Sequence, residues 1–124
     1  MKAIHYDTEG DILSVTFTEA EKQKQIGLEI SDNIVLYYNP ETKMPLKLLL
    51  LSYRALLQAS TQAPILLDGL NQAPVEVQAT VTALLKHEPL TAFIQVIEAR
   101  DQTPLTGRLH EIFTPATLQT VAAT

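Results

Sequence analysis

Cysteine is absent from the 124 residues of this sequence, and glycine is rare. Without cysteine, a disulfide framework, a thiolate metal site and a cysteine nucleophile are all excluded. The glycines stand isolated at positions 10, 27, 69 and 107, so no glycine-rich loop can cradle a phosphate, and no serine lies in a Gly-x-Ser-x-Gly motif. We therefore expect no ATP, NAD, flavin or other cofactor, and an enzyme is disfavoured.

Basic residues and long apolar runs are also scarce. Nine Lys and Arg stand against 14 Asp and Glu, a net charge of −5, and they are dispersed except for Lys22 and Lys24. This distribution disfavours nucleic-acid binding, which needs a clustered basic surface. The apolar stretch 46–57 is interrupted by Lys47, Ser52 and Arg54, and a membrane span needs about 20 apolar residues. Residues 1–7 show no signal-peptide pattern, so we expect a cytoplasmic protein that does not contact a membrane.

The residues that are present indicate a folded domain. The sequence is 46% hydrophobic and only 19% charged, unlike the composition of disordered chains. Its length lies in the range of one domain that can bury a core without staples. We expect residues 1–124 to form a single domain.

Residues 3–51 alternate between apolar and polar side chains, as half-buried strands do. Two such runs are 13–18 (LSVTFT) and 26–31 (IGLEIS). Asp32-Asn33 predicts a tight hairpin to a strand over 34–38, and 39–43 (NPETK) predicts a second turn. The following strand, 46–51, is apolar at nearly every position and is expected to be covered on both faces. We predict a five-stranded antiparallel β-meander over 3–51.

Residues 52–124 change to a helical pattern and predict a mainly helical extension that covers the sheet. Ser52 is a candidate N-cap for a helix over 53–57, and Pro74 precedes an apolar stripe that stops before Pro89. Residues 91–97 are ambiguous between strand and helix, and we favour helix. Thr103-Pro104 and Thr114-Pro115 predict two short C-terminal helices. The fold class is α+β, with an N-terminal antiparallel sheet covered by C-terminal helices.

The segments 6–13 (YDTEGDIL) and 29–36 (EISDNIVL) resemble the bacterial domain-of-unknown-function family 2283. The resemblance covers about residues 3–57, although Asn33 stands where the family favours glycine and 45–47 (PLK) replaces a glycine-containing segment. The tail after residue 60 looks like an extension found in cyanobacterial members. The resemblance implies a sheet, a prokaryotic host and an antitoxin-like partner role. It does not point to any catalytic activity.

His5, Asp7, Glu9 and Asp11 form the densest group of potential metal ligands or acid–base residues. An EF-hand counted from Asp7 fails, since its sixth and twelfth positions are Ile12 and Thr18. We interpret the group mainly as turn chemistry, with a weak divalent-metal site or catalysis as alternatives.

Two further histidines have structural explanations. His87 is expected at a helix C-terminus, where it complements the helix dipole. His110 lies between Arg108 and Glu111, which can form an i, i+3 ion pair on a helix.

Three functions are compatible with these features. The first is a protein–protein interaction or assembly module, as a homo-oligomer or with a protein partner. The second is an antitoxin-like regulator that uses its acidic balance to bind a small basic toxin. The third is a metal binder or enzyme that uses the N-terminal acidic group.

Overall fold

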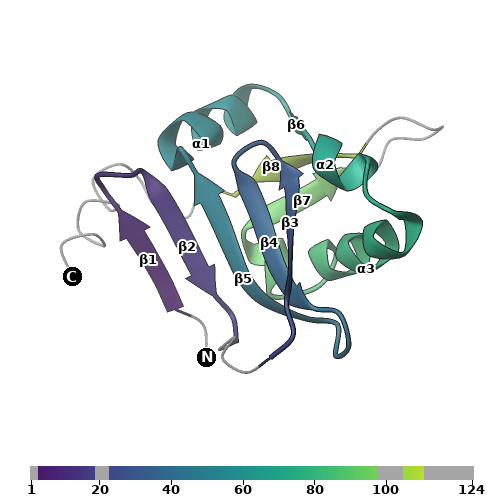
Figure 1. Ribbon diagram of the computed structural model, residues 1–124. Helices are drawn as coiled ribbons and strands as arrows, with labels where there is room; N and C mark the ends of the chain where they lie inside the picture. Colours follow the sequence, from purple (N-terminus) through teal and green to yellow (C-terminus); the bar gives the residue numbers. More distant parts are fainter. Residues whose placement is uncertain (1–2, 19–22, 98–104, 111–124) are drawn as a thin grey trace.

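A computed structural model describes residues 3–18, 23–97 and 105–110. The N-terminal half forms an antiparallel sheet of five strands (Figure 1). They are β1 (Ala3–Asp7), β2 (Ile12–Thr16), β3 (Ile26–Ser31), β4 (Ile34–Asn39) and β5 (Met44–Leu51). The predicted α+β class with an N-terminal five-stranded antiparallel sheet is confirmed.

The strand order is β1-β2-β5-β4-β3, which differs from the sequential order of a meander. Strand β5 lies between β2 and β4, and β3 forms the edge opposite β1. Local pattern predicts strands but not their long-range partners. The central position suits β5, because it is the longest of the five strands and carries an apolar side chain at almost every residue.

Two turns position the strands of this sheet as the sequence predicts. Asp32 and Asn33 connect β3 to β4, although only Asn33 has a positive φ, of 71°. At the β4–β5 turn the Asn39 side chain accepts hydrogen bonds from the backbone N–H groups of Glu41 and Thr42, at 2.9 and 3.3 Å. The turn ends at Lys43, whose φ of 59° allows the chain to reverse.

The second half contains helices and a second sheet. The helices are α1 (Tyr53–Gln62), α2 (Asp68–Asn71), α3 (Val75–Leu85) and the short 3₁₀ helix η1 (Leu90–Ala92). A three-stranded sheet in the order β6-β8-β7 is formed by β6 (Ile65–Leu66), β7 (Ile94–Ile97) and β8 (Thr106–Leu109).

This second sheet corrects the prediction of a mainly helical extension. Residues 94–97 form a strand, because Ile94, Val96 and Ile97 pair with β8 and tertiary pairing overrides a short helical pattern. Residues 106–109, where a helix after Thr103-Pro104 was expected, form β8 itself. The helix expected after Thr114-Pro115 lies outside the described residues.

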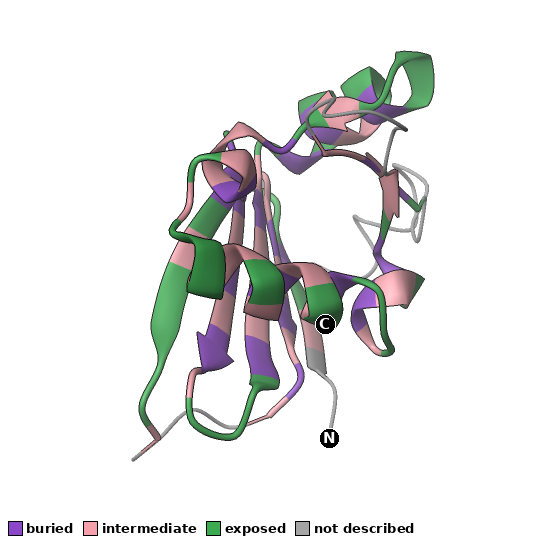
Figure 2. Ribbon diagram, turned by 90° about the vertical axis from the view of Figure 1, so that its right-hand side faces the viewer, coloured by how far each residue is buried: buried purple, intermediate pink, exposed green. Residues whose placement is uncertain are grey.

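One cluster of buried apolar residues draws on both halves of the chain. Figure 2 shows the large sheet on the left, with α1 and the second sheet to its right. The sheet contributes residues such as Leu13, Leu36 and Leu48, and the second half contributes residues such as Val81 and Phe93. No helix in the described part of the chain is long and apolar enough to cross a bilayer.

Three polar side chains connect elements of the second half to one another and to the large sheet. The buried Ser60 hydroxyl of α1 accepts a hydrogen bond from the Leu109 N–H at 2.6 Å. The Asn71 side chain donates to the carbonyls of Leu67 and Leu105 and accepts from the Leu105 N–H. The Ser31 hydroxyl of β3 donates to the Leu66 carbonyl at 2.8 Å.

Candidate functional site

The residues of the N-terminal acidic group lie in two different environments. His5, Asp7 and Glu9 are exposed on β1 and in the turn after it. The Asp7 carboxylate accepts a hydrogen bond from the Glu9 N–H at 3.1 Å, which is the local turn contact expected of it. Asp11 is partly buried and makes its contacts with other elements.

Asp11 joins the β1–β2 turn to helix α1. Its carboxylate accepts a hydrogen bond from the Tyr6 hydroxyl at 2.6 Å, and its two oxygens lie 3.3 and 3.2 Å from the Arg54 backbone N–H. Its backbone carbonyl accepts from the Tyr53 N–H at 2.9 Å. Ser52, the predicted N-cap, stands at the cap position but makes no side-chain cap hydrogen bond. Asp11 therefore performs the capping from a distant part of the sequence.

The ring of Tyr6 is part of the same joint. Tyr6 is buried, lies edge-on to the Tyr53 ring at 6.3 Å between centroids, and has the Arg54 guanidinium 6.0 Å from its ring centroid. Burial raises the pKa of the Tyr6 hydroxyl above its ordinary value, and the Asp11 carboxylate raises it further, while Arg54 opposes the shift. The joint is therefore built around a neutral tyrosine.

The described residues contain no group of three or more His, Asp or Glu side chains arranged to hold a metal ion. The two later histidines also stand apart. His87 follows the C-terminus of α3, as expected, whereas His110 follows strand β8 and lies on no helix. Arg108 lies on β8 and donates to the Ser60 carbonyl at 3.5 Å, and Glu111 is outside the described residues.

A pocket of about 610 Å³ lies at the end of the large sheet where β2 ends and β5 begins, beneath helix α3. We call it the end pocket. Its walls are mostly apolar and include Phe17, Met44, Pro45, Ala83, Leu84 and Pro89. Such a size and lining are typical of sites that bind small molecules.

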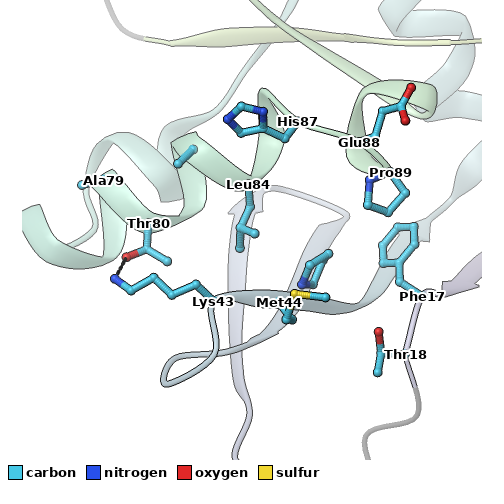
Figure 3. A pocket seen from close by; sticks show the side chains of 12 residues that line it. Phe17, Thr18, Lys43, Met44, Ala79, Thr80, Leu84, His87, Glu88 and Pro89 are labelled. Atoms are coloured by element: carbon cyan, nitrogen blue, oxygen red, sulfur yellow. Dashed lines mark hydrogen bonds between the residues drawn. The ribbon is translucent and has the colours of Figure 1, made fainter.

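Polar groups of the end pocket gather along its margin. Figure 3 shows Lys43 at one end, where its ammonium donates to the Thr80 hydroxyl at 3.3 Å, and Phe17 and Pro89 at the other end. The Glu88 carboxylate points away from the Met44 and Leu84 side chains in this view. The pocket therefore has a lysine at one end, and Phe17 and Pro89 with Thr18 and Glu88 at the other end.

The large sheet has a second notable surface, on the side opposite the buried core. Strand register aligns Ile12 with Leu51, both Ser14 and Val35 with Leu49, and Tyr37 with Lys47. We call this surface the outer face; it comprises His5, Asp7, Ile12, Ser14, Thr16, Glu29, Val35, Tyr37, Lys47, Leu49 and Leu51.

Apolar residues occupy the middle of the outer face. Ile12, Val35, Tyr37, Leu49 and Leu51 are all half-buried. Among the described elements, α1 and the second sheet lie on the other side of the large sheet (Figure 2). The expectation that the last strand of the sheet is covered on both faces is therefore wrong for the described part of the chain.

No family model, curated protein or solved structure matches this chain. The resemblance to family 2283 stays a prediction.

No sequence pattern predicts the end pocket, since its lining comes from three separate segments. The outer face does have a sequence signal: the consecutive leucines 48–51 must place apolar side chains on both sides of any strand.

Proposed function

We propose that this protein is a cytoplasmic protein–protein interaction module, without catalytic activity, that self-associates through its outer face. The observation that carries the proposal is the half-exposed apolar centre of that face, around Leu49. A sheet face with exposed apolar side chains often marks a protein interface. Two such faces can pack about 10 Å apart with their strands nearly aligned.

The dimensions of the outer face suit a modest interface. Five strands spaced by about 4.8 Å and paired over about five residues each span roughly 24 by 17 Å. Each face therefore covers about 400 Å², and two such faces bury about 800 Å² in total, which is below the range of stable specific complexes. We therefore expect a dimer that dissociates on dilution rather than an obligate one.

The charges of the outer face favour a second copy as the occupant. Lys47 lies on the central strand, whereas Asp7 and Glu29 lie on the two edge strands. Because both signs are present, a facing copy can place the central ammonium against peripheral carboxylates. Rim pairs of this kind guide alignment more than they add affinity.

The test is sedimentation velocity over a range of protein concentrations. The wild-type chain should shift from monomer to dimer, and Leu49→Glu should remain monomeric because it places a carboxylate in the apolar centre. Val75→Glu is the matched control, since Val75 is 82% exposed on α3, away from the outer face. Circular dichroism should show both variants folded.

Two outcomes would contradict the proposal. One is a wild-type chain that stays monomeric at every concentration, and the other is a Leu49→Glu dimer as strong as the wild type. If the chain is monomeric but captures a host protein through the same face, self-association is replaced by a hetero-complex; Thr16→Arg, a milder change on the outer face, should then weaken that capture.

A further inference from the structure

We propose that the end pocket binds a small amphipathic molecule with an apolar body and one anionic end, the chemical class of a medium-chain carboxylate. This site is separate from the outer face and its function does not depend on self-association.

The walls of the end pocket favour an apolar body. Met44 is a large apolar side chain that remains 51% exposed beside the pocket, and Phe17 and Leu84 contribute further apolar surface. On α3 the lining residues Ala79 and Ala83 are small, so the helix leaves space where a larger side chain would fill the pocket. An apolar ligand would remove this surface from water.

The position of Lys43 favours an anionic end. Lys43 ends the β4–β5 turn with a φ of 59°, and the Asn39 side chain holds that turn, so the backbone of the exposed lysine has a defined place beside the pocket. Its ammonium already contacts the Thr80 hydroxyl, and the pair offers two hydrogen-bond donors to a carboxylate.

The separation of the two ends fixes the direction of the ligand. The anionic group should lie between Lys43 and Thr80, and the apolar body should extend toward Phe17 and Pro89 (Figure 3). Glu88 also borders the pocket, but its carboxylate points away from the cavity and does not oppose this orientation.

The test is a titration of the full ¹⁵N-labelled chain with decanoate, below the concentration at which decanoate forms micelles. We expect saturable shifts of the amide signals of Phe17, Ala83 and Leu84. The neutral analogue 1-decanol should bind about two- to fivefold more weakly, which is the scale of one exposed charge-assisted contact.

Substitutions test the charge of Lys43 and the volume of the pocket separately. Lys43→Gln should reduce decanoate affinity to that of 1-decanol, whereas Lys47→Gln, which removes a lysine from the outer face, should leave the preference intact. Ala83→Phe should weaken both ligands about tenfold or more by filling the pocket, and Ala83 is exposed, so the core is undisturbed.

Three results would overturn the proposal. They are shifts that rise linearly without saturation, a decanoate preference that survives Lys43→Gln, and an Ala83→Phe variant that binds as tightly as the wild type. Equal binding of decanoate and 1-decanol would show an apolar groove without selection for an anion, which also contradicts it.

Discussion

Replacing Asp11 should destabilise the fold far more than replacing the neighbouring acidic residues. Loss of the carboxylate removes the cap of α1, worth about 1 kcal/mol. It also leaves the hydroxyl of the buried Tyr6 without its acceptor, at a cost of about 1–3 kcal/mol. Asp11→Gly should therefore lower the free energy of unfolding by about 2–4 kcal/mol.

Three substitutions at position 11 separate the effect of losing the carboxylate from the effect of backbone strain. Asp11 has a φ of 54°, which glycine adopts without strain but alanine does not. Asp11→Ala should therefore be less stable than Asp11→Gly by about 1 kcal/mol. Asp11→Asn tolerates the same φ and keeps one acceptor oxygen, so it should be the mildest change of the three.

Urea unfolding followed by circular dichroism gives these differences, provided that the dependence on urea concentration is unchanged. Glu9→Gln is the matched control, because it neutralises an exposed carboxylate in the same turn and should change stability by less than about 0.5 kcal/mol. If Asp11→Ala is no less stable than Glu9→Gln, the inference that Asp11 joins the turn to α1 is wrong.

Three other substitutions test further contacts. Gly69→Ala should cost about 2 kcal/mol or more, because an added Cβ would lie 1.8 Å from the Glu29 carbonyl oxygen, and backbone would have to move. Ser60→Ala should cost about 1–3 kcal/mol in thermal unfolding, since the Leu109 N–H loses its acceptor. The raised pKa of Tyr6 stabilises the fold fully below pH 10.0 and progressively less as pH rises through the folded-state pKa, so Tyr6→Phe should flatten the loss of stability above pH 10.0.

Each of these expectations has a comparison that can contradict it. Gly107→Ala is the control for Gly69, because its added Cβ would lie 3.3 Å from the Ile94 side chain and 3.4 Å from the Gln95 carbonyl oxygen, much less close than at Gly69, and should cost less. Thr61→Ala changes an exposed residue on the same helix as Ser60, and an equal loss in both variants would refute the buried contact. An unchanged alkaline slope in Tyr6→Phe would refute the role of that hydroxyl.

The predictable part of the fold was the part specified by local pattern. The alternation in 13–17 and the turns at 32–33 and 39–43 depend on neighbouring residues, so their strands and hairpins follow from sequence. The pairing of β2 with β5 and the second sheet depend on contacts between distant residues, which pattern does not encode.

For the N-terminal acidic group, the sequence predicts only the role of Asp7 in the turn. Asp7 makes the turn contact expected from its position three residues before Gly10. The role of Asp11 could not be foreseen, because its partner Arg54 is 43 residues away in the chain.

The central position of β5 also affects the order in which the protein folds during synthesis. The β1–β2 hairpin leaves the ribosome about 30 residues before the strand that flanks it, since β2 ends at Thr16 and β5 begins at Met44. Until then, Leu13 and Val15 have β1 on one side and no strand on the side that β5 later occupies. Synthesis arrested before residue 44 should therefore leave an unpaired edge of β2 to which chaperones bind, and release of β5 should pair that edge while the core face stays exposed until the second half follows.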